Sequence, residues 1–181
     1  MDGFRIVPVP QSIADQIRKE RSDDHGNVEI QPTRTEEPRA WPCRVCLEEA
    51  SVGEEMLLFS YSPFERPVPY RNVGPIFVHA TACKPYDRPA TVPDLMRRRL
   101  LALRGYSAQD RMIECDLVEG AVLESLIERF FENPEVAYIH AHNARAGCFV
   151  CRIERDRPVA AIDPRKDKVL GQRGSRSQTG S

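Results

Sequence analysis

The sequence lacks the features that mark membrane, secreted and nucleic-acid-binding proteins. No apolar run approaches the roughly 18 residues that a membrane helix needs. The first residues hold no basic segment that leads into an apolar stretch, so we expect no signal peptide, no membrane partner and a cytoplasmic location. The formal net charge of −1 excludes a whole-protein electrostatic footprint for DNA or RNA, and we expect no nucleic-acid partner.

The motifs that would identify a reaction are missing as well. No segment resembles a P-loop, a G-x-G-x-x-G turn or a G-x-S-x-G nucleophile elbow. The sequence therefore names no substrate and leaves open whether the protein is an enzyme. A small-molecule ligand, a metal ion and a homodimeric partner all remain compatible with it.

The composition is that of a globular chain. Of the 181 residues, 41% are hydrophobic and 29% charged, which favours a single domain, placed at 1–160, followed by a disordered tail at 161–181. Fifteen prolines favour a looped mixed fold over a bundle of long helices. The six cysteines are expected to be mostly reduced thiols in the cytoplasm, because disulfides are rare there.

Hydrophobic periodicity predicts an α+β fold, with a mostly antiparallel sheet packed against two main helices, 93–104 and 120–132. The second helix is the better supported, because its apolar residues form one broad stripe. A short helix over 12–21 and a polar loop or arm over 22–40, with a brief strand at 28–30, are expected near the start. Further strands are predicted at 4–9, 43–47, 55–61, 75–79, 112–118, 136–142 and 148–154.

The segment 138–151 is the most informative for function. It reads as a hairpin with a loop over 143–147, where Asn143 and Gly147 tolerate positive φ. That register sets His142 opposite Cys148 and His140 opposite Val150. Since side chains alternate along a strand, one face is predicted to carry two imidazoles and a thiol. The predicted members of this face are His140, His142, Cys148, Val150 and Arg152, with Ile139, Ala141, Phe149, Cys151 and Ile153 facing the helices.

Three functional hypotheses follow from this face. In an enzyme or small-molecule binder, Cys148 would be a nucleophile or redox thiol, His142 its base and His140 an orienting group, with Asn143 beside them. In a metal-binding module, His140 and His142 would bind the ion with Cys148 or His79 as third ligand. In an interaction or dimerisation domain, the histidines would be packed and hydrogen-bonded. The residues predicted to bind an anionic substrate are Arg44, Cys43, Tyr70 and Arg71.

The two C-x-x-C pairs, Cys43 with Cys46 and Cys148 with Cys151, suggest a four-cysteine zinc site. Both pairs lie in predicted strands, where residues three apart point to opposite faces, whereas a zinc knuckle needs a turn that brings the thiolates together. We therefore expect ordinary buried thiols at Cys46, Cys83, Cys115 and Cys151.

Several short segments together resemble a bacterial family known as domain of unknown function 1203. The resemblance covers roughly residues 4–155, and the stretch from His140 to Cys148 is its most specific part. It implies a bacterial cytosolic domain and transfers no established activity. The segments that carry it are Pro42-Cys43-Arg44, Gly53-Glu54, Pro69-Tyr70-Arg71, Gly74 to His79, Arg98 to Leu101, His140 to Ala144 and Gly147-Cys148.

Overall fold

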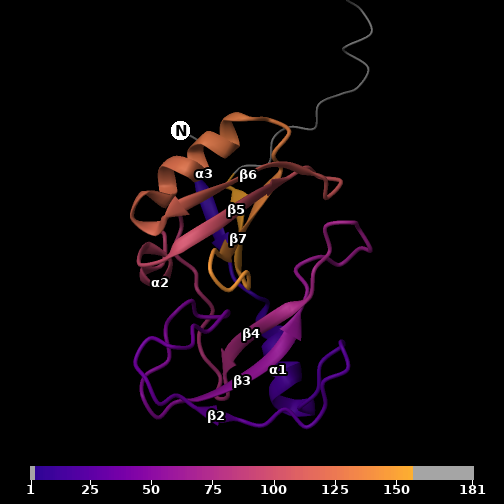
Figure 1. Cartoon of the computed structure of the whole chain (residues 1–181), viewed down its shortest axis with the longest axis vertical. Helices are drawn as coiled ribbons and strands as arrows, with labels where there is room; N and C mark the ends of the chain where they lie inside the picture. Colours follow the sequence, from indigo (N-terminus) through magenta and orange to yellow (C-terminus); the bar gives the residue numbers. More distant parts are fainter. Residues whose placement is uncertain (1–2, 157–181) are drawn as a thin grey trace, which may run out of the picture.

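The computed structural model describes residues 3–156, which form two β-sheets placed one above the other (Figure 1). The expected tail at 161–181 lies outside the described residues. Both sheets are antiparallel and both carry helices, so the predicted fold class is confirmed. No helix among residues 3–156 has the length and apolar character that crossing a bilayer requires.

The larger sheet has the strand order β1-β8-β7-β5-β6, and helix α3 (Leu123–Glu132) covers one of its faces (Figure 1). Leu123, Ile127 and Phe130 are buried in the core that the helix shares with the sheet. Removing these apolar side chains from water is the main force that holds the helix on the sheet. The strands are β1 (Phe4–Val7), β5 (Leu100–Tyr106), β6 (Met112–Glu119), β7 (Tyr138–Asn143) and β8 (Phe149–Arg155).

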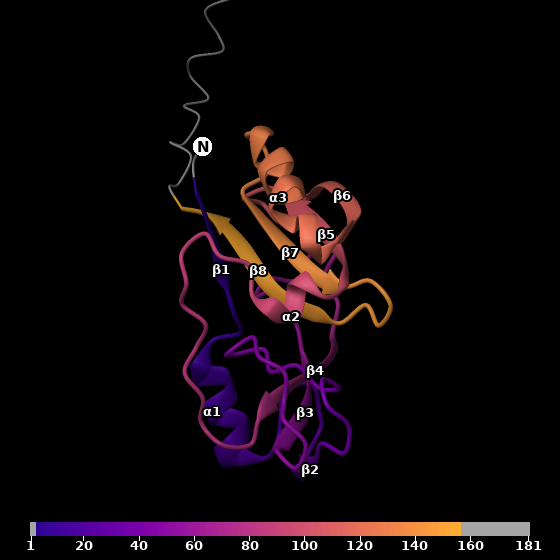
Figure 2. The ribbon, with the colours of Figure 1, turned by 90° about the vertical axis from the view of Figure 1, so that its left-hand side faces the viewer.

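The smaller sheet, β2-β3-β4, is built from β2 (Thr33–Arg34), β3 (Glu55–Tyr61) and β4 (Gly74–His79). Helix α1 (Gln11–Glu20) follows β1 directly and lies beside this sheet (Figure 2). Its buried residues, Ala14 and Ile17, belong to a second hydrophobic core. Phe149 of β8 also packs into this second core, so the larger sheet contributes to the core of the smaller one.

The predicted helix over 93–104 is wrong for most of its length. Only α2 (Asp94–Arg97) is helical, and β5 begins at Leu100. Leu101 and Leu103 alternate with more exposed neighbours, which fits a strand as well as a helix over so short a run. The segment forms a strand because it pairs with β6 on one side and with β7 on the other.

Two further strand predictions near the N-terminus are wrong. The segment 28–30 is irregular, and the short strand β2 follows it instead. The segment 43–47 is a turn, flanked by a bridge between Pro42 and Glu49. Leu47 has a φ of 54°, a left-handed conformation that bulky residues rarely adopt and that turns the chain back.

The hairpin β7–β8 exists, but its register differs from the prediction. His140 pairs with Arg152 in the regular part of the ladder, and a β-bulge after Ala141 then pairs His142 with Phe149. An extra residue in one strand of a pair shifts the side chains that follow it to the other face. Phe149 therefore shares a face with the histidines, while Val150 joins the core beneath α3.

Gly120, which opens the short 3₁₀ helix η1 (Gly120–Val122), allows α2 and η1 to approach closely. Its N–H donates to Arg99 O at 2.8 Å, and a Cβ atom at this position would lie 1.8 Å from the carbonyl oxygen of Met96.

Because the backbone must move to relieve such a clash, we expect Gly120→Ala to lower the free energy of unfolding by about 3 kcal/mol. Chemical denaturation measures this. Gly74→Ala is the control, since a Cβ there meets nothing within 4 Å; equal stability of the two variants would contradict the account.

Candidate metal centre

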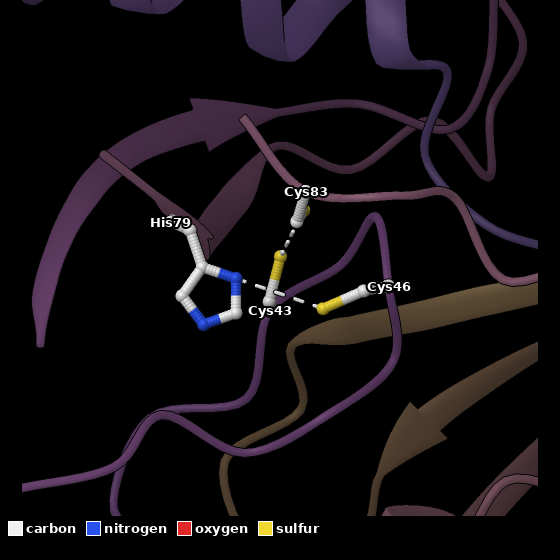
Figure 3. Close-up of side chains that lie close together, drawn as sticks. All are labelled: Cys43, Cys46, His79 and Cys83. Atoms are coloured by element: carbon white, nitrogen blue, oxygen red, sulfur yellow. Dashed lines mark hydrogen bonds between the residues drawn. The ribbon is translucent and has the colours of Figure 1, made fainter. Parts of the chain in front are cut away.

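Three cysteines and a histidine converge at one edge of the smaller sheet (Figure 3). They are Cys43, Cys46, His79 and Cys83, and their ligand atoms all lie within 4.8 Å of one another. Cys43 and Cys46 come from the turn 43–47, His79 from the end of β4 and Cys83 from the loop that follows. Two stretches of chain that are distant in sequence, the turn 43–47 and residues 79–83, thus place their metal-binding atoms at one point.

Two distances within this cluster match those expected around one tetrahedral metal ion. Cys43 Sγ lies 3.8 Å from Cys83 Sγ, and Cys46 Sγ lies 3.6 Å from His79 Nδ1. With zinc–sulfur bonds of about 2.3 Å and zinc–nitrogen bonds of about 2.0 Å, a tetrahedron has a sulfur–sulfur edge of about 3.8 Å and a sulfur–nitrogen edge of about 3.5 Å. The other ligand atoms lie within 4.8 Å of one another, so the group could close around such an ion.

The turn 43–47 brings its two thiols together through backbone hydrogen bonds. The N–H of Cys43 donates to Glu48 O at 2.9 Å, which closes the turn. The N–H of Val45 points at Cys43 Sγ, 3.4 Å away, and so supports negative charge on that sulfur. A bridge between Cys43 and Phe77 anchors the turn beside β4, the strand that ends at His79.

The second ring nitrogen of His79 faces a carboxylate. Glu54 Oε2 lies 3.6 Å from His79 Nε2, within ion-pair range, while Nδ1 faces the sulfur atoms. A carboxylate on the outer nitrogen fixes the tautomer and orientation of a metal-binding histidine and raises its basicity. Glu54 therefore occupies the position of an outer-sphere partner.

The electrostatics of the cluster favour one thiolate. Hydrogen bonds from Cys46 and Cys83 hold the pKa of Cys43 well below its usual range. The hydrogen bond between Cys46 and Cys43 raises the pKa of Cys46. The hydrogen bond between His79 and Cys43 raises the pKa of His79 to about 10. The group thus concentrates negative charge on the sulfur of Cys43 and keeps the ring of His79 protonated, so a soft cation that binds here would displace the imidazolium proton.

A cavity of about 710 Å³ borders the cluster and reaches Cys46, His79 and Cys83. Cys83 and His79 are half-buried, whereas Cys43 is fully buried. Solvent therefore has a path to the ligand atoms on one side.

Three of the residues predicted to form an enzyme site lie together, apart from the metal cluster. Arg44 turns away from the thiols on either side of it: its Nε donates to Phe149 O at 2.5 Å and its Nη1 to Pro42 O at 2.6 Å. Its Nη2 donates to Cys148 Sγ at 3.3 Å, and Asn143 Nδ2 donates to the same sulfur at 3.1 Å. The structure thus brings Arg44, Asn143 and Cys148 together.

The two histidines have other neighbours. His142 Nδ1 lies 3.0 Å from Gly147 O, and its cross-strand partner is Phe149, not the predicted Cys148. His140 is completely buried, and its two ring nitrogens, like Nε2 of His142, have no hydrogen-bond partner among the described residues. Aromatic rings surround His140, namely those of Phe64, Tyr106, Tyr138 and Phe149.

The remaining predicted substrate-binding residues lie elsewhere. Cys43 belongs to the metal cluster, and the ring of Tyr70 packs against Tyr106. Neither Tyr70 nor Arg71 borders the cavity next to Arg44.

The cluster was not predicted, because 43–47 was expected to be a strand. A signal was nevertheless present: His79 and Cys83 are four residues apart, a second short pair of ligand-type residues beside the C-x-x-C of the turn. Cys46 and Cys83, which were expected to be ordinary buried thiols, belong to the cluster, and Cys115 is exposed. The second C-x-x-C pair, Cys148 and Cys151, is not part of the cluster. Cys151 is instead fully buried and contacts Met96 in the core of the larger sheet.

The buried histidines predict how stability depends on pH. Burial lowers the pKa of His140 to about 2 and that of His142 to about 4, whereas an unfolded histidine titrates near 6.5. Between pH 6.5 and 4 the unfolded chain therefore binds protons that the folded chain does not. The free energy of unfolding has its highest value above pH 6.5. Below that pH it falls by about 1.4 kcal/mol per pH unit for each histidine.

Denaturation at pH 7, 6 and 5 tests this expectation. His140→Phe keeps an aromatic ring in the aromatic enclosure and removes one titrating group, so its stability should fall less steeply with acidification than that of the original protein. Parallel pH profiles for the two proteins would contradict the assignment of a buried neutral imidazole at position 140.

Comparison with known proteins gives one match. The family model described as "Protein of unknown function (DUF1203)" matches residues 40–155, a range that contains both the metal cluster and the Arg44–Cys148 contact. Searches of curated proteins and of solved structures found no match. Since the matched range spans more than half of the chain, the protein belongs to the DUF1203 family.

Proposed function

We propose that this protein is a zinc-binding module in which Cys43, Cys46, His79 and Cys83 bind one zinc ion. The observation that carries the proposal is the convergence of all four ligand atoms within 4.8 Å, with edges of 3.8 and 3.6 Å. Three sulfur ligands and one imidazole in a tetrahedral arrangement are a donor set that selects zinc over hard cations such as magnesium.

The proposed site is structural rather than catalytic. Four protein ligands complete the tetrahedral coordination of zinc, whereas catalytic zinc sites keep a position for water or substrate. The ion would join the turn 43–47, the end of β4 and the loop 80–92, a loop that contains no helix or strand. Because such loops bury little apolar surface, metal coordination would supply much of the energy that orders them.

Free thiols support the proposal. All six cysteines lie within the described residues and none forms a disulfide. Cysteine binds zinc only in reduced form, and the cytoplasmic location expected from the sequence would keep it reduced. We place metal binding ahead of thiol catalysis because Phe149, and not Cys148, is the cross-strand partner of His142.

The metal content of the purified protein tests the proposal. We expect one zinc per chain by elemental analysis of protein produced without a histidine tag, and loss of most of that zinc in Cys83→Ser. Serine is a poor ligand for zinc, and three remaining ligands leave the tetrahedron incomplete.

Cys115→Ser is the matched control. Cys115 is exposed on β6, away from the cluster, and its replacement should leave the zinc content unchanged. Protein refolded with added zinc that holds none, or Cys83→Ser with the same content as the control, would overturn the proposal. Circular dichroism of both variants separates loss of the ligand from loss of the fold.

A further inference from the structure

A second cavity, of about 640 Å³, lies where the turn 43–47, the start of β5 and the β7–β8 loop meet. We propose that this cavity binds a small anionic ligand whose carboxylate or phosphate group is held by Arg44 beside the thiol of Cys148. The proposal goes beyond zinc binding and uses none of the metal ligands. The residues that carry it are Arg44, Arg98, Arg99, Asn143, Arg145 and Cys148, all of which line the cavity.

Arg44 is the main reason to expect an anion. Arg44 is only 2% exposed to solvent, yet no carboxylate among the described residues forms an ion pair with it. Its hydrogen bonds go to two neutral carbonyl oxygens and to the sulfur of Cys148. Burial of a guanidinium without a carboxylate or phosphate partner costs free energy, and an anionic ligand in the adjoining cavity would offset that cost.

The charge of the cavity wall points the same way. Arg98 and Arg99 share one carboxylate, that of Glu49, at 3.3 and 2.7 Å. Arg145, exposed on the β7–β8 loop, forms no ion pair with any residue of the described range 3–156. Of the described residues that line the cavity, Glu119 is the one carboxylate, against the four arginines Arg44, Arg98, Arg99 and Arg145.

Two side-chain donors that line the cavity point at the same atom. The Nη2 of Arg44 and the Nδ2 of Asn143 both converge on Cys148 Sγ, at 3.3 and 3.1 Å. A carboxylate or phosphate oxygen next to this sulfur would lie within reach of the same donors, and guanidinium groups bind such oxygens in a two-point manner. Because Cys148 is only half-buried, it remains accessible from the cavity.

The test compares two alkylating reagents that differ only in charge, iodoacetate and iodoacetamide. In both reactions the Cys148 sulfur displaces iodide and forms a sulfur–carbon bond, but only iodoacetate carries a carboxylate. Mass spectrometry of peptides measures each rate at Cys148 and at Cys115, an exposed cysteine outside the cavity, in the protein as purified. We expect the ratio of iodoacetate to iodoacetamide labelling to be about tenfold higher at Cys148, the factor expected for one charge-assisted hydrogen bond.

Competition identifies the class of anion. At constant ionic strength, protection of Cys148 by malonate alone indicates a carboxylate ligand, and protection by inorganic phosphate indicates a phosphate ligand. Arg145→Ala, which changes an exposed loop residue, should lower the labelling ratio at Cys148 and leave that at Cys115 unchanged. Equal ratios at the two cysteines, with no protection of Cys148 by either anion, would overturn the proposal; the zinc content does not enter this readout.

Discussion

The structure around both candidate sites depends on one constraint, the turn 43–47 held against the end of β4. The N–H of Arg44 donates to Phe77 O at 2.9 Å, and the left-handed Leu47 returns the chain towards Glu49. On one side this turn offers two thiols to His79 and Cys83. On the other side Arg44 extends to Cys148, so adjacent residues of one short turn serve two different sites.

The same turn also connects the two sheets. Arg44 Nε donates to the carbonyl of Phe149 on β8, and the ring of Phe149 packs in the core of the smaller sheet. The metal cluster lies beside the smaller sheet (Figure 3), while Asn143 and Cys148 belong to the β7–β8 hairpin of the larger one. Binding of zinc would therefore stiffen the segment that positions Arg44 between the sheets.

The local sequence pattern was sufficient to predict part of the fold, but it was not sufficient to predict the two candidate sites. The apolar stripe over 120–132 fits a helix and the short apolar run within 55–61 fits a strand, and both elements form as predicted. The leucines of 100–103 fit two periods, and long-range pairing with β6 and β7 decided between them. The turn at 43–47 has no glycine or proline after Pro42, so nothing local signals it; contacts with Phe77 and Glu48 impose it. Asn143 and Cys148 were correctly grouped because they flank a short loop, whereas the bulge that moved Phe149 next to His142 left no trace in the sequence.

The most direct measurement is X-ray absorption at the zinc edge of the purified protein. The account predicts a first coordination shell of three sulfur atoms at about 2.3 Å and one imidazole nitrogen at about 2.0 Å. A shell made up only of nitrogen and oxygen, or one that keeps three sulfur atoms after Cys46→Ser, would contradict it.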